Sequence, residues 1–166
     1  SHTSITCQLQ EGQGTELEVV VDVTGQTSSD GSASLIPFSY LPPNVVSASP
    51  LSSPTMGGVV VTLHGESFGL RDATVTLLGD GLASAGSPLS TNIGPIAVDF
   101  QNHTTILFTV PEGHGTHRSI RLDVDGQSHV YVAAPFHYEA PTFTFLEQPA
   151  PCTTRVRTTA CGSPTQ

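Results

Sequence analysis

The sequence predicts an all-β fold, a β-sandwich, and three observations lead to this prediction. Apolar and polar residues alternate along several short segments, which is the two-residue period of a half-buried strand. Turn-forming pairs such as Asp125-Gly126 follow these segments, and they favour tight hairpins because they accept positive φ. No segment shows the period of a convincing helix. Short strands separated by turns are typical of two packed antiparallel sheets.

The clearest alternation occurs in two segments that resemble each other. Residues 17–23 and 120–124 both alternate, and they end at the turn pairs Thr24-Gly25 and Asp125-Gly126 respectively. Alternation along a strand places every second side chain on the same face. The residues predicted to share one apolar face are Leu17, Val19, Val21 and Val23 in the first segment and Ile120, Leu122 and Val124 in the second.

These two segments belong to a longer internal repeat. Gly113 follows Gly12 by 101 residues (113 − 12), and Tyr138 follows Tyr40 by 98 residues (138 − 40). A period of that size corresponds to one domain per repeat. The repeats end alike, because Phe38 and Tyr40 are matched by Phe136 and Tyr138, and each aromatic pair is expected on one face of a strand.

The phase of the repeat sets the expected domain organisation. The chain begins inside one repeat and ends just inside another, as a mature or excised piece of a longer protein would. We expect residues 1–42 to be the closing half of a domain, residues 43–141 to be a complete domain, and residues 142–166 to be the first strand of a further repeat or a donor-strand tail.

The remaining elements follow from local composition. Residues 79–95 are rich in Gly, Ser and Pro and predict a long surface loop. Gly57-Gly58 precedes a strand at a position that favours unusual φ. Positive φ in turns is also expected at Gly12, Gly14, Gly113 and Gly115. Further strands are predicted at Val45–Ala48, Val59–His64, Ala73–Leu78 and Ile106–Val110.

Charge and composition exclude several classes of partner. The chain has a formal net charge of −9, with five arginines and no lysine. Binding to nucleic acid or to an anionic membrane depends on basic side chains, so neither partner is expected. No apolar run reaches the length of about 20 residues that a spanning helix needs, so direct membrane insertion is not expected. The low charge density and the many Ser, Thr, Pro and Gly residues suggest an extracellular or cell-surface protein.

Motifs from Pro43 onward are specific enough to suggest a family. The opening motifs are Pro43-Asn-Val-Val-Ser-Ala-Ser-Pro50, Gly57-Gly58 and Ser67-Phe-Gly69, and the closing motifs are Val110-Pro-Glu-Gly-His-Gly115, Val124-Asp-Gly-Gln127 and Phe136-His-Tyr138. This segment resembles an IPT/TIG domain, the immunoglobulin-like fold of plexins, some transcription factors and many tandem cell-surface proteins. The resemblance implies an immunoglobulin-like β-sandwich over residues 43–141 and only the closing half of one over residues 4–42.

The chain contains three cysteines, an odd number. In an extracellular protein, one of them then pairs outside this segment or stays free. Cys152 and Cys161 could close a small loop within a Thr-rich stretch, which would leave Cys7 without a partner. Alternatively, Cys7 could be bridged to Cys152 or Cys161 of a neighbouring chain. Cys7 takes the place that Phe108 has in the second copy of the repeat.

One short motif matches the nucleophile elbow of α/β-hydrolases. Residues 65–69 read Gly-Glu-Ser-Phe-Gly, with Ser67 at the nucleophile position. The motif works only as a strand–turn–helix that holds the serine on a strained bend. The residues after Gly69 look strand-like, so we expect Phe68 to fill the core and Ser67 to have no catalytic role.

Two patterns suggest metal sites only weakly. His114 and His117 have a spacing that binds zinc on a helix, but a glycine-containing loop does not hold the two side chains together. Asp123 and Asp125 precede a glycine as in a calcium loop, but no carboxylate occupies the later ligand positions. The sequence therefore predicts a non-catalytic protein without a metal or a cofactor.

Asn102-His-Thr104 is a sequon for N-glycosylation. It lies between the predicted surface loop and a strand, where a glycan could be tolerated. Asn102 is therefore a candidate attachment site if the protein is secreted through a eukaryotic pathway, which makes covalently attached glycans possible partners.

The incomplete first repeat leads to a hypothesis about function. Half of a sandwich would expose an apolar face and unpaired strand edges. Strands of a neighbouring copy could complete it, with Phe143, Phe145 and Val156 as donor candidates, and such head-to-tail contacts build a filament. The sequence thus predicts a structural protomer of a surface filament that assembles with copies of itself. The alternative is a fragment of a tandem-repeat receptor or adhesin ectodomain, acting as a binding or spacer module.

Overall fold

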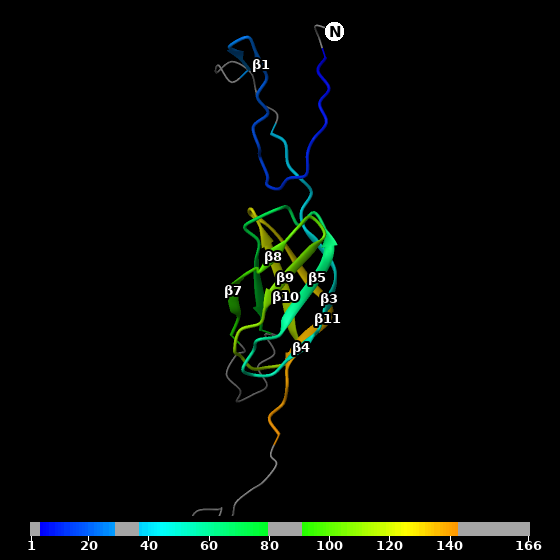
Figure 1. The fold of residues 1–166 in the computed structure, drawn as a ribbon, viewed down its shortest axis with the longest axis vertical. Coiled ribbons are helices and arrows are strands. Elements are labelled where there is room, and N and C mark those ends of the chain that lie inside the picture. Colours follow the sequence, from blue (N-terminus) through cyan, green and yellow to red (C-terminus); the bar gives the residue numbers. More distant parts are fainter. Residues whose placement is uncertain (1–3, 29–36, 80–90, 143–166) are drawn as a thin grey trace, which may run out of the picture.

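A computed structural model describes residues 4–28, 37–79 and 91–142 of the 166-residue chain. These residues form eleven strands and no helix. Figure 1 shows a sandwich, with the N-terminal segment extending beyond one end and the chain leaving at the opposite end. Five candidate residues lie outside the described ranges: Cys152, Cys161, Phe143, Phe145 and Val156.

The sandwich has two layers. One is a five-stranded sheet in the order β4-β11-β10-β6-β7, and the other is a four-stranded sheet in the order β3-β5-β9-β8. In the first sheet, β10 pairs antiparallel with both β6 and β11. In the second sheet, β9 pairs antiparallel with both β5 and β8. The strands are β3 (Asn44–Ser49), β4 (Ser52–Ser53), β5 (Val60–Glu66), β6 (Thr74–Leu78), β7 (Ile93–Ala97), β8 (Phe100–Gln101), β9 (Thr105–Thr109), β10 (Arg118–Val124) and β11 (Gln127–Tyr138).

The core lies between these two sheets and is built by alternating residues. Along β10, every second residue from Arg118 to Val124 is buried, while the residues between them are more exposed. The facing sheet contributes buried side chains from β5 and β9 in the same way. The apolar side chains that become fully or almost fully inaccessible include Val61, Leu63, Phe68, Val75, Leu77, Ile106, Phe108, Ile120, Leu122 and Phe136. The two-residue period therefore predicts the core of the complete domain correctly. Phe68, in the loop after β5, also fills the core, as expected for the Gly-Glu-Ser-Phe-Gly segment.

The predicted loop over residues 79–95 is too long at its C-terminal end. Residues 93–97 form β7, which pairs with β6 at the edge of the larger sheet. The sequence Ile93-Gly-Pro-Ile-Ala97 contains a glycine and a proline, and these residues suggest a loop when read locally. An edge strand accepts proline because one side of the strand needs no backbone donor.

The N-terminal segment keeps only part of its predicted strand pairing. Within residues 17–23, the described pairing consists of β1 (Asp22–Val23) with β2 (Gln26–Thr27) and a single bridge from Leu17 to Phe38. The matching strand of the complete domain, β10, has a neighbour on each side. A counterpart of β6 does not occur in residues 4–28 or 37–42, and the strand is correspondingly short.

Candidate interaction surfaces at the repeat junction

The two closing halves share their backbone conformation at every turn. The turns after the alternating segments both have two successive residues at positive φ, as a type I′ hairpin requires. Outside glycine, a positive φ is uncommon, so its recurrence at matching positions shows the same local fold. The matched φ values are 104° and 103° at Gly14 and Gly115, 54° and 55° at Glu16 and His117, 54° and 45° at Thr24 and Asp125, and 85° and 81° at Gly25 and Gly126.

A tyrosine anchors the turn in each closing half. The Tyr138 hydroxyl donates to the Pro111 carbonyl at 3.0 Å, and its backbone N–H donates to Gly115 at 2.9 Å. Tyr40 makes the matching bonds to the carbonyls of Gln10, at 3.1 Å, and Gly14, at 2.9 Å.

The ring of each tyrosine lies against a phenylalanine and a glycine. Phe136 packs edge-to-face on Tyr138 with ring centroids 5.4 Å apart, and the first copy has the same pair at 5.0 Å. A Cβ on Gly113 would lie 2.6 Å from the Tyr138 ring, and one on Gly12 would lie 2.5 Å from the Tyr40 ring. The predicted positive φ is confirmed at Gly14, Gly115 and the Gly57-Gly58 pair. Gly12 and Gly113 are instead needed for the close approach of the ring.

The side chains of the first copy differ from those of the second in exposure. In the complete domain, the inner faces of β9 and β10 are buried against the opposite sheet and neighbouring strands. In the N-terminal segment, the matching positions are open to solvent, and Cys7, in the place of Phe108, is an exposed free thiol. The exposed fractions are 72% against 0% for Ile5 and Ile106, 56% against 1% for Leu9 and Val110, 51% against 0% for Val19 and Ile120, and 57% against 1% for Val23 and Val124.

A second surface forms where the first copy meets the complete domain. The Gln13 side chain accepts hydrogen bonds from the N–H groups of Leu70, at 2.8 Å, and Arg71, at 3.2 Å, and donates to the Arg71 carbonyl at 2.9 Å. Gln127 donates to the Tyr40 carbonyl at 3.0 Å. We call this set of contacts the first junction; it joins the turn at residues 12–14 to the loops of the complete domain.

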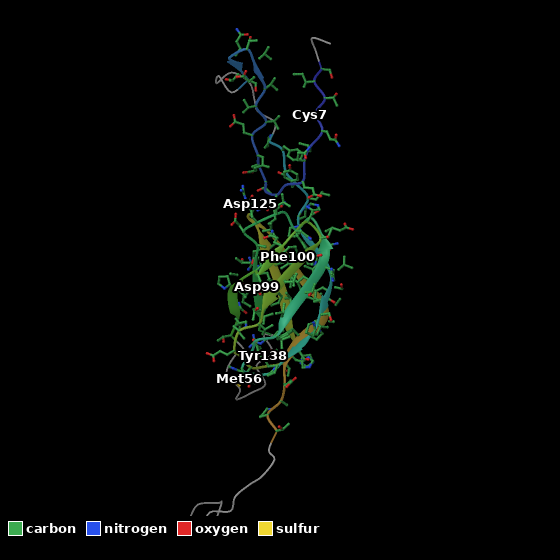
Figure 2. All side chains as sticks on the ribbon, viewed as in Figure 1. Cys7, Met56, Asp99, Phe100, Asp125 and Tyr138 are labelled. Atoms are coloured by element: carbon green, nitrogen blue, oxygen red, sulfur yellow. The ribbon has the colours of Figure 1, made fainter. Side chains whose placement is uncertain are left out.

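Two glycines let the first junction close. A Cβ on Gly69 would collide with the Gln13 side chain, and one on Gly14 would collide with the Asp125 carboxylate. Gly14 is buried, although the residues around it are exposed or half-buried. Figure 2 shows Asp125 at the end of the sandwich nearest the N-terminal segment, and Tyr138 and Met56 near the opposite end.

Arg118 is fully buried in β10, where the first copy has Leu17. Its guanidinium donates to the carbonyls of His114 and Thr91 at 2.6 to 3.0 Å, and lies 5.9 Å from the centre of the Tyr138 ring. The burial of Tyr138 raises the pKa of its phenol, and the nearby Arg118 charge partly opposes that rise. Arg118 therefore ties the turn at residues 112–115 and the loop before β7 to the core.

The residues considered for chemistry are not brought together. Ser67 lies in a loop at a positive φ of 60°, and β6 follows it rather than the helix that a nucleophile elbow requires. His114 and His117 are both exposed in the turn before β10, while Asp123 and Asp125 lie at the end of that strand. The described ranges contain no group of three or more His, Cys, Asp or Glu side chains placed to hold a metal.

Asn102 is half-buried in the turn between β8 and β9. Its side-chain carbonyl accepts hydrogen bonds from the N–H groups of Thr104, at 2.9 Å, and Thr105, at 2.7 Å. Glycosylation modifies the amide nitrogen, which these bonds do not use. Asn102 stays a candidate site on this geometry.

Two structural roles, those of the junction glutamines and of Arg118, are absent from the sequence-based prediction. Gln13 and Gln127 were not singled out, because a glutamine beside a turn carries no distinctive signal. The burial of Arg118 was also missed, although its alignment with Leu17 inside an alternating segment indicates an inward-facing position. Arginine is rarely fully buried, so composition alone argues against that position.

The architecture defines the class of the protein. Two facing sheets of five and four strands, antiparallel except for the β4–β11 pair, enclose one core and form an immunoglobulin-like β-sandwich. The family model for the IPT/TIG domain matches residues 43–138, which is more than half of the chain. The chain therefore belongs to the IPT/TIG family, as its motifs predict.

Other comparisons add little to this assignment. A search of curated proteins found no match. A solved structure of a structural genomics protein of unknown function from Bacteroides thetaiotaomicron is 22% identical and has a TM-score of 0.45. That match covers 60% of this chain and 22% of the other one. The described part of the chain contains no helix that could cross a membrane.

Proposed function

We propose that the protein is a non-catalytic, extracellular structural module, in which an IPT/TIG opening half completes the exposed closing half at residues 4–42. In the form that the geometry supports best, that opening half belongs to the same polypeptide, so the chain acts as a spacer in a tandem-repeat ectodomain at the cell surface.

The exposed apolar face of the N-terminal segment carries this proposal. Val19, for example, is half exposed, whereas Ile120 at the matching position is fully buried. Burial of apolar surface contributes about 25 cal/mol per Å², so covering the whole face is a strong driving force. The turns of this segment already have the φ values of the complete domain, so an opening half would meet turns of matching conformation.

The complete domain shows what the covering segment has to provide. There, β9 pairs with β5 and β10 pairs with β6, and these two neighbours come from different sheets. A full opening half supplies both strands. The sequence after Pro141 resembles only the first strand of a repeat. A tandem arrangement therefore provides both covering strands, whereas residues 142–166 of a neighbouring copy would provide only the first.

Assembly into a surface filament is the second candidate. It is favoured by Cys7, an exposed free thiol at the position that the buried Phe108 has in the complete domain. In this form, residues from another copy of the chain cover the face by strand complementation, with Phe143, Phe145 or Val156 inserted. A disulfide from Cys7 to Cys152 or Cys161 of the neighbour would lock the contact. The filament is then a head-to-tail homopolymer.

Hydrogen exchange combined with light scattering on the 166-residue chain separates the two forms. A spacer lacking its opening half should remain monomeric, with fast exchange of the backbone amides at residues 17–23. A filament protomer should form fibres visible by negative-stain microscopy, with slow exchange there and Cys7 bridged across chains in non-reducing peptide maps. A monomer with slow exchange at residues 17–23 would be a self-sufficient unit and would contradict both forms.

A further inference from the structure

We infer that the far end of the complete domain is a docking surface for the loop end of a following IPT/TIG domain. The surface, which we call the second junction, consists of Glu112, Gly113 and His114 with the adjacent Thr55 and Ile93, and the buried Arg118 holds its turn through the His114 carbonyl. The inference rests on the proposed spacer function and adds to it the residues that fix the orientation of successive domains.

The first junction shows how such a surface works. Glu11, Gly12 and Gln13 of the first copy lie against Leu70, Arg71 and Asp72 of the complete domain, and together they line one pocket. Gln13 is the centre of this contact, because its amide both accepts from and donates to the backbone of the 70–71 loop.

The same positions recur at the other end of the molecule. Glu112, Gly113 and His114 match Glu11, Gly12 and Gln13 in the repeat, and the tyrosine anchor and turn φ values match as well. These three residues line an open pocket together with Arg118, Thr55 and Ile93. The second junction therefore has the same tyrosine bonds as the first and matching φ values at Gly115 and His117.

The connection to a following domain also has the right length. Pro43, where the complete domain begins, lies three positions after Tyr40, and Pro141 lies three positions after Tyr138 (43 − 40 and 141 − 138). A domain that begins at Pro141 would thus be connected to Tyr138 by a linker of the same length as the one that follows Tyr40. Residues 139–142 are exposed.

The chemistry of the second junction fits a loop like Leu70-Arg71-Asp72. A neutral imidazole has one donor and one acceptor nitrogen, so His114 can bond both the N–H and the C=O groups that Gln13 bonds. Glu112 is exposed at the position of Glu11, which lines one pocket with Arg71 in the first junction. The geometry therefore selects the loop end of another IPT/TIG domain as the occupant.

A fusion protein tests this inference. Residues 1–141 are extended by residues 44–142 of a second copy, which contains the whole core from Val45 to Tyr138. Spin labels are attached at the exposed Val132 of both copies, as Val132→Cys on a Cys7→Ser background. Double electron–electron resonance then measures the distance distribution between the two domains.

A docked second junction should give one narrow distance, and His114→Gln, which copies the first junction, should preserve it. The double variant Glu112→Ala/His114→Ala should broaden the distribution to that of a fusion with a lengthened linker. A wild-type distribution as broad as the long-linker control, or a narrow one that survives the double variant, would overturn the inference. Because residues 17–23 take no part in this measurement, its outcome is independent of the hydrogen-exchange test above.

Discussion

At the scale of single residues, Tyr138 links the turn before β10 to the last strand. Its hydroxyl donates to Pro111, and its ring is almost completely buried. Tyr138→Phe should lower the free energy of unfolding of the complete domain by about 1 kcal/mol, because the Pro111 carbonyl loses its donor. Urea unfolding of the full chain measures this. Tyr40→Phe is the matched control and should leave the main transition unchanged, since Tyr40 lies outside the core of the complete domain.

The same residue predicts a dependence on alkaline pH. Burial raises the pKa of Tyr138 above the ordinary value of 10.0, with Arg118 opposing part of the rise. Because the pKa is raised in the folded state, the contribution of the protonated Tyr138 to the unfolding free energy is complete below pH 10. It is lost as the pH increases through the folded-state pKa. We expect the unfolding free energy to fall above pH 10, and to fall less in Tyr138→Phe. Equal slopes in the two proteins would show that other groups cause the loss.

At the scale of elements, Arg118 connects β10 to the turn at residues 112–115 and to the loop before β7. Arg118→Leu copies Leu17 of the first repeat but removes the donors to the carbonyls of His114 and Thr91. We expect a loss of about 2 kcal/mol in urea unfolding. Arg121→Ala is the control: its ion pair with Asp123 is partly exposed, so the loss should stay below about 1 kcal/mol. Equal losses of unfolding free energy in Arg118→Leu and Arg121→Ala would mean that the buried hydrogen bonds of Arg118 contribute no more than an exposed ion pair.

The first junction is also an element-scale contact, and Gln13 is its centre. Gln13→Ala removes the acceptor for the N–H groups of Leu70 and Arg71. The exchange rates of these two amides, measured by NMR, should rise, while those in β10 stay unchanged. Gln10→Ala is a suitable control, since only its backbone carbonyl bonds with Tyr40. Unchanged rates at residues 70 and 71 in Gln13→Ala would show that the junction does not hold in solution.

At the scale of the whole molecule, an aspartate at the same position of the repeat should destabilise the complete domain but not the N-terminal copy. Leu122→Asp buries an unpaired carboxylate in the core and should cost about 4 kcal/mol or more, which unfolds a marginally stable domain. Val21→Asp occupies the matching but exposed position and should leave the thermal unfolding of the isolated chain unchanged. Circular dichroism distinguishes these outcomes. A large loss in Val21→Asp would show that the N-terminal face is covered in solution.

Sequence and structure each contribute a distinct part of this description. The alternation along residues 17–23 and 120–124, the turn pairs and the repeat of glycines and tyrosines were enough to predict a sandwich, its core and its family. These signals are local or periodic, so they can be detected without knowing what packs against what. The edge strand β7 was missed for the same reason, because its glycine and proline carry a local loop signal that pairing with β6 overrides.

By itself, the sequence determined that two copies of one closing half exist, since equal patterns fold into equal turns. Only the tertiary structure decided that one copy is buried and the other exposed, that Arg118 points inward, and that Gln13 holds the loop after Gly69. Burial depends on which strands lie opposite a face, and a hydrogen bond between residues 57 positions apart depends on how the chain is folded. Neither can be obtained from the pattern of a single segment.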